Sequence, residues 1–280
     1  MMRVEHLSCA CLCPRGWPWL IDAGGDAAMS EICCHCLLIH GEEGLILVDT
    51  GFGRADLRAP ARRLGRAFTA VARPRRDESL CAIHQIEARG FRASDVRHIV
   101  LTHLDLDHAG GLSDFPQAQV HVHAAEHAAA MHPHWRERGR YRSCQWQHAV
   151  RWQLHDGGGE DWFGLRGLKA LPGTADDVQL IPMPGHTRGH CAVAVRSAQG
   201  WLLHAGDAYF HHGEMCDPPQ RPAAIEALQG LLNNDRAQRL ANRDRLRALA
   251  TQAASQVRVF CAHDPQELAR LQGAASWQEA

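Results

Sequence analysis

The sequence predicts a soluble α/β fold built as one domain over residues 1–280, with a core of about residues 31–270. Two observations predict this class. Short apolar runs of strand length recur along the chain, and segments with the three- and four-residue spacing of helices lie between several of them. The second half of the chain also repeats the rhythm of the first, because apolar runs in both halves end at a histidine or an aspartate.

The composition is that of an ordinary globular protein, with 45% apolar and 22% charged residues. A formal net charge of −1 argues against binding to nucleic acid or to an anionic membrane through bulk electrostatics. No segment approaches the roughly 18 apolar residues of a membrane helix, and residues 1–20 lack the apolar core of a signal peptide. We therefore expect a cytoplasmic protein that has no nucleic-acid or membrane partner.

The eleven cysteines are expected to be mostly reduced thiols in that compartment. Three of them alternate in C-A-C-L-C at residues 9–13. A metal-binding cluster is the less favoured interpretation of this segment, because a zinc knuckle needs wider spacing and a second cysteine pair. Cys33, Cys34 and Cys36 are interpreted as small apolar residues of a strand.

The first regular elements form a predicted β-hairpin. Residues 31–40 are an apolar run, residues 41–44 are a polar break with two glycines, and the run L-I-L-V-D-T-G follows. Asp49 therefore lies where the second strand gives way to a loop.

Residues 54–76 carry eight arginines and one acid, with apolar residues at a spacing that suits an amphipathic helix. The arginines form either a solvated helical face or a patch for nucleic acid or phosphate, and the solvated face is favoured. A further helix is predicted over residues 80–90, ended by Gly90. The later elements are strands at 96–102 and 119–123, a helix at 124–131, strands at 178–183, 191–195 and 201–204, a helix at 225–250 and a strand at 257–261.

Residues 132–163 show no regular pattern and mix tryptophans with arginines. Aromatic and arginine side chains together can bind single-stranded nucleic acid. Because the whole chain is nearly neutral, we instead expect a long loop that forms one wall of a pocket.

Histidines and aspartates follow several of the predicted strands. His103 begins the loop after one strand, and His186, Asp207 and His263 follow three others. Packed strands fix their ends, so side chains just beyond them can converge with little loss of entropy. Imidazoles and carboxylates held together in this way suit divalent metal ions. The sequence therefore predicts a metal site.

The segment T-H-L-D-L-D-H-A-G-G at residues 102–111 is the most specific signal. Its two histidines, five residues apart with acids between them, suit a loop around a cation, and its glycines permit tight turns. This segment resembles the H-x-H-x-D-H signature of the metallo-β-lactamase superfamily. Four other residues match that family in order and context: Asp49 in V-D-T-G, His186 in P-G-H-T, Asp207 in A-G-D and His263 near the C-terminus. The resemblance covers residues from about 31 to 270.

The resemblance implies a four-layer αββα sandwich of two similar halves, with two divalent ions at one edge between the sheets. Zinc is the first expectation, and manganese or iron are alternatives. By matching motif, the first ion would be bound by His103 and His186, the second by Asp107, His108 and His263, and Asp207 would bridge them. Asp49 would orient neighbouring loops and ligands without binding metal.

Asp105 is the one departure from the signature, because the family usually has a second histidine at this position. A carboxylate can still bind the first ion, and the flavodiiron branch of the superfamily has a comparable acid there. We expect Asp105 to be a ligand that makes the first ion a weaker Lewis acid and favours manganese or iron beside zinc. In the alternative, its side chain points away and the first site is weak.

The motifs are most similar to the branch that contains quorum-quenching lactonases. This implies hydrolysis of a small ester or lactone by a hydroxide that bridges the two ions, with Asp107 orienting the nucleophile and passing its proton to the leaving oxygen. Tyr209 is a second candidate catalytic residue, as a hydrogen-bond donor to the substrate carbonyl. Those lactonases place a tyrosine one residue farther on, where this chain has Phe210, so a packing role for Tyr209 is equally expected.

Other functions stay open from the sequence. Thioester or phosphodiester hydrolysis would use the same fold and ions. A flavodiiron-like oxidoreductase would hold iron at these positions, but it needs a flavin close by and the chain has no flavodoxin-like extension. A metal-dependent binding or regulatory protein is a further alternative, should Asp105 disable the first site.

Overall fold

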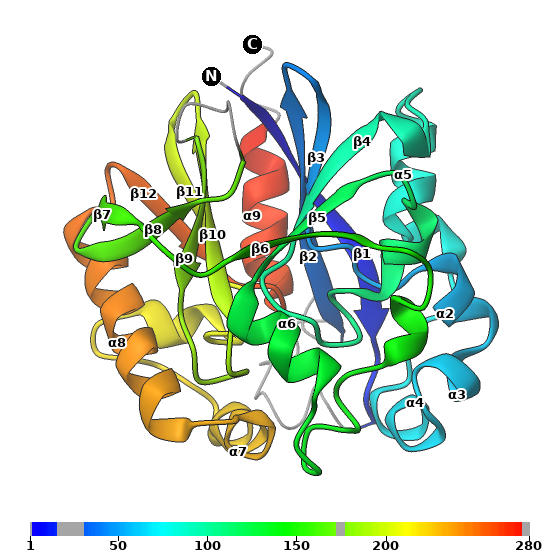
Figure 1. The fold of residues 1–280 in the computed structure, drawn as a ribbon. Coiled ribbons are helices and arrows are strands. Elements are labelled where there is room, and N and C mark those ends of the chain that lie inside the picture. Colours follow the sequence, from blue (N-terminus) through cyan, green and yellow to red (C-terminus); the bar gives the residue numbers. More distant parts are fainter. Residues whose placement is uncertain (1, 16–30, 172–176, 276–280) are drawn as a thin grey trace.

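The computed structural model describes residues 2–15, 31–171 and 177–275, which form two six-stranded mixed sheets (Figure 1). Of residues 1–20, where no signal peptide is predicted, residue 1 and residues 16–20 lie outside this part. The first sheet has the strand order β1-β2-β3-β4-β5-β6, and the second has the order β12-β11-β10-β9-β8-β7. The strands of the first sheet are Arg3–Leu12, Ile32–Gly41, Gly44–Val48, Val96–Val100, Gln119–His123 and Arg151–His155, from β1 to β6. Those of the second are Glu160–Trp162, Leu165–Lys169, Val178–Pro182, Cys191–Ser197, Gly200–His204 and Val257–Phe260, from β7 to β12.

Helices cover the outer faces of the sheets. The α-helices are α2 Arg54–Arg58, α3 Pro60–Arg63, α4 Arg66–Ala72, α5 Ala82–Ala88, α6 Ala124–Met131, α7 Ala223–Leu232, α8 Arg236–Gln252 and α9 Pro265–Ala275. One apolar core lies between the two sheets and includes Leu37 of β2 and Val193 of β10. A second core joins the first sheet to helices such as α5, and a third joins the second sheet to α8. This arrangement confirms the expected four-layer α/β fold.

The strands that carry the predicted ligands run in matching directions within each sheet. In the first sheet β3 and β4 are parallel. In the second, β11 and β12 are parallel, and β9 runs with β11 because both are antiparallel to β10. Carboxyl ends of strands that run together meet at one edge of a sheet, so the loops after them are brought close to one another.

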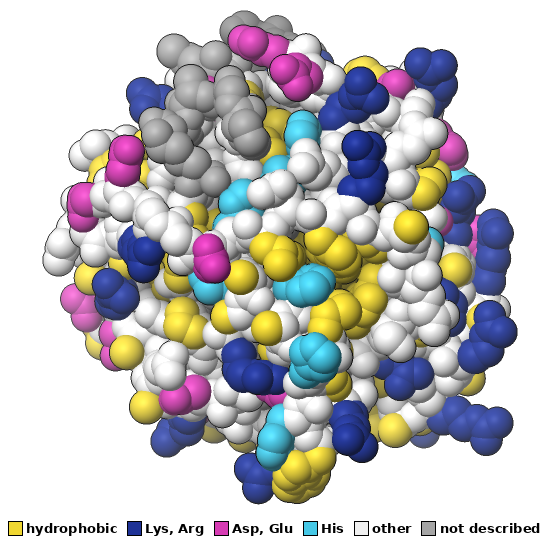
Figure 2. All heavy atoms as spheres, viewed as in Figure 1, with side chains coloured by type: hydrophobic (Ala, Val, Ile, Leu, Met, Phe, Trp, Pro, Cys, Tyr) yellow, Lys and Arg dark blue, Asp and Glu magenta, His cyan; other side chains and the backbone are white. Residues whose placement is uncertain are grey.

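The prediction of one continuous helix over residues 54–76 is wrong, because this segment forms the three short helices α2, α3 and α4. Pro60 begins α3, where a proline needs no hydrogen-bond donor, and Gly65 precedes α4 with a φ of +98°. Six of the eight arginines are exposed and two are partly buried, one of them Arg63, which pairs with the buried Asp56. Figure 2 shows basic side chains gathered at the right of the molecule, over the region of α2–α5.

The predicted helix over residues 225–250 is also two helices, α7 and α8. Asp235 is the N-cap of α8, and its carboxylate accepts a hydrogen bond from the backbone N–H of Gln238. An N-cap aspartate satisfies a free donor at a helix start, so the chain restarts a helix there with a new direction.

The region 132–163 was predicted to be irregular throughout, but it contains β6 and β7. β6 pairs in parallel with β5, and the alternating side chains of a strand at a sheet edge give little sequence signal. No strand was predicted at β1 or β8. The predicted hairpin is present as β2 with β3, and the strands predicted at 191–195 and 201–204 are the antiparallel pair β10 and β11.

In the described ranges, no helix combines the length and the apolar character that a membrane crossing requires.

Candidate metal centre

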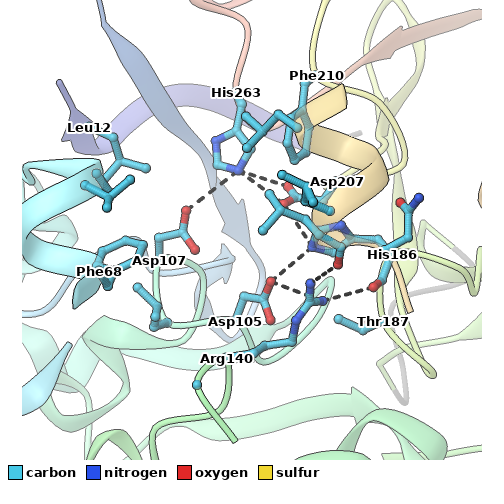
Figure 3. A pocket seen from close by; sticks show the side chains of 18 of the residues that line it. Leu12, Phe68, Asp105, Asp107, Arg140, His186, Thr187, Asp207, Phe210 and His263 are labelled. Atoms are coloured by element: carbon cyan, nitrogen blue, oxygen red, sulfur yellow. Dashed lines mark hydrogen bonds and ion pairs between the residues drawn. The ribbon is translucent and has the colours of Figure 1, made fainter. Parts of the chain in front are cut away.

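The side chains predicted to bind metal gather around one centre, and Figure 3 labels five of them: Asp105, Asp107, His186, Asp207 and His263. Four of them bring one donor atom each within 4.8 Å of one another: His103, Asp105, His186 and Asp207. His108, Asp207 and His263 form a second group by the same measure. Asp207 belongs to both groups, as a bridging ligand must.

Asp207 presents its two oxygens to different histidines. Oδ2 lies 3.3 Å from Nε2 of His186 and 3.8 Å from Nε2 of His103. Oδ1 lies 3.3 Å from Nε2 of His108 and 3.1 Å from Nε2 of His263, which is also 3.2 Å from Oδ2. One carboxylate therefore stands between two sets of donors.

Three of the four imidazoles are fixed by hydrogen bonds through Nδ1. His108 donates to Asp49 at 2.8 Å and His263 to the backbone carbonyl of Cys33 at 2.8 Å. His103 lies 2.9 Å from the hydroxyl of Thr102, which itself donates to Asp49. A proton on Nδ1 leaves a lone pair on Nε2, and Nε2 is the atom that faces the centre in each case.

Asp49 holds this arrangement as the sequence analysis expected of a supporting acid. Its carboxylate accepts hydrogen bonds from the backbone N–H and the hydroxyl of Thr102 and from His108. Its φ of +54° is a left-handed conformation that aspartate tolerates better than most residues, and it lies directly after β3. Burial opposes ionisation of Asp49, but the charge and hydrogen bond of His108 lower its pKa.

The donor atoms fit divalent cations. Nε2 of His103, Nε2 of His108, Oδ1 of Asp105 and Oδ1 of Asp207 are buried and have no hydrogen-bond partner among the described residues. Buried polar atoms are nearly always paired, and the unpaired Nε2 atoms of His103 and His108 both face the carboxylate of Asp207, so a ligand is needed there. Nitrogen and carboxylate oxygen are the donor set of zinc and of harder divalent ions.

Electrostatics around the donors also favour a cation. Burial works against a charge on His108 and on His263, yet Asp207 raises the pKa of both imidazoles above the ordinary value. The negative potential that would retain a proton there would also attract a divalent ion. Burial, with the nearby charge of Arg140, lowers the pKa of His186 to about 4, which keeps that imidazole neutral as a ligand must be.

Asp105 points into the centre and not away from it (Figure 3). Its Oδ2 lies 3.0 Å from Nε2 of His186 and 3.4 Å from Nε2 of His103. Sequence reasoning missed its other neighbour, Arg140, whose Nη1 is 3.4 Å from the same oxygen. Burial opposes ionisation of Asp105, but Arg140 and His103 hold its pKa well below the ordinary value. No motif marks Arg140, which comes from the region predicted to wall the pocket.

Tyr209 does not face the centre, which agrees with the packing role and not with contact to a substrate carbonyl. Its side chain is fully buried, and its hydroxyl donates to the carboxylate of Glu267 at 2.9 Å. The neighbouring Phe210 lies at the cavity instead, with its ring against those of His186 and His263. Of these two adjacent residues, Tyr209 has its hydroxyl in the core and Phe210 has its apolar ring at the site.

A cavity of about 1360 Å³ opens over the donors. Phe68 and Val71 of α4 line one side, and Leu228 and Leu231 of α7 line another. Residues from 134 to 140 contribute a polar edge, so the predicted pocket wall is present. No sequence pattern predicted that α7 lines the cavity.

Comparison with known proteins gives consistent results. Residues 34–257 match the family model described as the metallo-beta-lactamase superfamily. The chain is 43% identical over 265 residues to the probable metallo-hydrolase Rv2300c of Mycobacterium tuberculosis, covering 94% of this chain and 81% of that protein. It is 30% identical to the N-acyl homoserine lactonase AttM of Rhizobium johnstonii, over 66% of this chain and 68% of that protein.

The fold matches solved structures over nearly its whole length. An N-acyl homoserine lactone hydrolase, determined with the product N-hexanoyl-L-homoserine at its catalytic metal center, superposes with a TM-score of 0.70. The match covers 95% of both chains at 21% sequence identity. At that identity, the likeness is one of fold.

Proposed function

This chain belongs to the metallo-beta-lactamase superfamily, and from that premise we propose that it is a hydrolase with two divalent ions that cleaves an ester or a lactone. The observation that carries the proposal is Asp207, whose two oxygens face two different sets of imidazole donors. Zinc is the first expectation for the ions. Manganese or iron are alternatives for the first site, because Asp105 adds a hard oxygen donor there.

His103, Asp105, His186 and Asp207 would hold the first ion, and His108, His263 and Asp207 the second. Asp107, whose Oδ2 lies 3.7 Å from Nε2 of His263, would complete the second site. When bound, a pair of divalent ions lowers the pKa of an attacking water and polarises the scissile carbonyl. The protein keeps these ligands in place through Asp49, Thr102 and the Cys33 carbonyl, which fix the imidazoles before substrate arrives.

Asp107 is the proposed proton carrier. Its side chain is 13% exposed and it lines the cavity, whereas Asp207 and His263 beside it are more deeply buried. From this position its carboxylate can accept a proton from the attacking water and return it to the leaving oxygen. The proposal gives Tyr209 no catalytic role, because its hydroxyl is committed to Glu267.

The cavity favours a substrate with an apolar part. The side chains of α4 and α7 over the centre are largely hydrocarbon, and such walls bind acyl chains and exclude water from the reacting groups. The named relatives that are N-acyl homoserine lactonases support a lactone as the first substrate to test.

The test is a metal analysis joined to a substrate panel. We expect two ions per chain by mass spectrometry, and hydrolysis of N-acyl lactones or aryl esters faster than of thioesters or phosphodiesters. Asp207→Asn should lose at least one ion and about 100-fold or more in kcat. Asp244→Asn, a surface carboxylate on α8, is the matched control and should change neither.

Other outcomes assign other functions. Cleavage restricted to thioesters or to phosphodiesters would replace the proposed substrate class. Redox-active iron without hydrolysis would indicate an oxidoreductase. Full binding of two ions without any turnover would contradict the hydrolase and favour a binding protein.

A further inference from the structure

We propose that Cys34 is a sulfur ligand of the second ion, beside Asp107 and His263. The inference rests on the proposed two-ion centre and adds to it a donor that the sequence analysis interpreted as a small apolar residue. Cys34 lies in β2, far in sequence from the segments that carry the other ligands.

Three donor atoms of different kinds meet at this point. Sγ of Cys34 lies 3.8 Å from Oδ2 of Asp107, and Nε2 of His263 lies 3.7 Å from the same oxygen. All three atoms are within 4.8 Å of one another. At ordinary zinc bond lengths, a sulfur and an oxygen ligand of one ion are about 3–4 Å apart. The observed spacing therefore suits a shared ion. Figure 3 shows the Asp107 carboxylate turned toward His263.

The backbone places the thiol firmly. On one side of Cys34, the carbonyl of Cys33 accepts the hydrogen bond of His263 Nδ1. On the other side, the backbone N–H of His35 donates to the carbonyl of Ala262 at 2.8 Å. Both bonds join β2 to the loop that carries His263, so the thiol and that imidazole are held against each other by the main chain. A ligand fixed in this way loses little entropy when an ion binds.

The surroundings of the thiol argue for a ligand and against a nucleophile. Cys34 is 2% exposed and is not among the residues that line the cavity, so a substrate has no path to its sulfur. Its polar contact is the hydrogen bond to Asp107. When an ion binds, the S–H bond is replaced by a bond from sulfur to the metal, and the proton leaves to solvent.

A sulfur donor would make the two sites unlike. Thiolate is a soft ligand that selects zinc, cobalt or cadmium, whereas the Asp105 carboxylate at the first site is a hard ligand that suits manganese or iron. The pair of residues would thus sort two kinds of metal within one centre. Cys34 and Asp105 would together give the two sites different metal preferences.

The test uses cobalt(II) in place of the natural ions. In the full-length protein with two cobalt ions bound, we expect a thiolate-to-cobalt charge-transfer band in the near-ultraviolet. Cys34→Ser should lose this band and bind the second ion about 10- to 100-fold more weakly by titration. Cys36→Ala is the matched control, because Cys36 is equally buried on the same strand and its thiol contacts Cys9 instead. It should keep both the band and the affinity.

The outcomes separate this inference from the proposed function. Two bound cobalt ions without a charge-transfer band, or a band that survives Cys34→Ser, would overturn the ligand role and leave the two-ion hydrolase standing. Failure of the wild-type protein to bind two ions would overturn both. Thermal unfolding of the metal-free variants checks that Cys34→Ser is folded, and Cys34→Ala gives the same comparison with a smaller side chain.

Discussion

At the residue scale, Asp105 and Arg140 form one unit. The carboxylate stands where the family usually has an imidazole, and it brings a negative charge into a buried place. The guanidinium at 3.4 Å offsets that charge and also donates to the backbone carbonyls of His186 and Leu232. Arg140 therefore joins the loop after β9 to the end of α7 while it holds Asp105.

Restoring the usual histidine should be costly for this reason. Asp105→His leaves Arg140 without its carboxylate partner in a site that is only 14% exposed. We expect the free energy of unfolding of the metal-free protein to fall by about 1–3 kcal/mol. The measurement is denaturant unfolding, with Asp244→Asn as the control for loss of an exposed carboxylate. A double variant that adds Arg140→Leu should recover part of the loss, and no recovery would contradict the coupling.

At the element scale, α4 and α7 line the cavity over the centre, and we expect them to select what enters it. Both are short helices that the sequence predicted as parts of longer ones, and their separation from α3 and α8 sets the directions in which Phe68 and Leu228 point. We expect these walls, more than the ligands, to distinguish one substrate from another.

Truncating the walls should affect long substrates selectively. Phe68→Ala or Leu228→Ala should raise KM about 10-fold for a long-chain acyl ester or lactone, because each removes apolar surface that the chain would bury. KM for a short-chain analogue should change little. Leu154→Ala on β6, whose side chain is 42% exposed and does not line the cavity, is the control. Equal effects on both chain lengths would show that the acyl group binds elsewhere.

Three neighbouring strands of the first sheet carry a chain of histidines. Nδ1 of His98 on β4 lies 3.0 Å from Nε2 of His121 on β5, whose Nδ1 lies 3.1 Å from Nε2 of His155 on β6. Burial, with the charges of His98 and His155, lowers the pKa of His121 to about 3. A neutral imidazole can donate at one nitrogen and accept at the other, and protonation removes the acceptor.

These three hydrogen-bonded histidines should make the free energy of unfolding depend on pH. A histidine with a depressed folded-state pKa stabilises the fold fully above its unfolded pKa near 6.5, and loses that contribution as pH falls toward the folded value. Between pH 6.5 and 5, protonation linked to His121 should lower the free energy of unfolding by about 2 kcal/mol. Unfolding measured across this range in the metal-free protein should show a steeper loss for wild type than for His121→Asn. Parallel curves would contradict the prediction.

At the scale of the whole molecule, the centre joins the two sheets. His103 and His108 follow β4 in the first sheet, whereas Asp207 and His263 follow β11 and β12 in the second. Bound ions would therefore link the two halves of the sandwich, and binding to the folded state alone stabilises it by mass action.

Chelation should lower the thermal stability. An ion at about 100 times its Kd contributes about 2.7 kcal/mol, so removal of both ions should lower Tm by at least about 5 °C. Zinc added back should restore it. Scanning calorimetry with and without chelator makes the comparison, and Asp207→Asn should respond much less to either treatment. A wild-type Tm that chelator leaves unchanged would argue that the ions do not bridge the sheets.

The sequence by itself determined the class of fold, most strands and which polar residues converge at the candidate centre, because these depend on local patterns: apolar runs, turn glycines and polar residues at strand ends. These local patterns were enough to single out His103, His186, Asp207 and His263. Only the tertiary structure decided that Asp105 points inward beside Arg140, that Tyr209 is buried against Glu267, and that Cys34 lies against Asp107. These contacts join segments distant in the chain, and their geometry follows from how two sheets pack together, which no local pattern encodes.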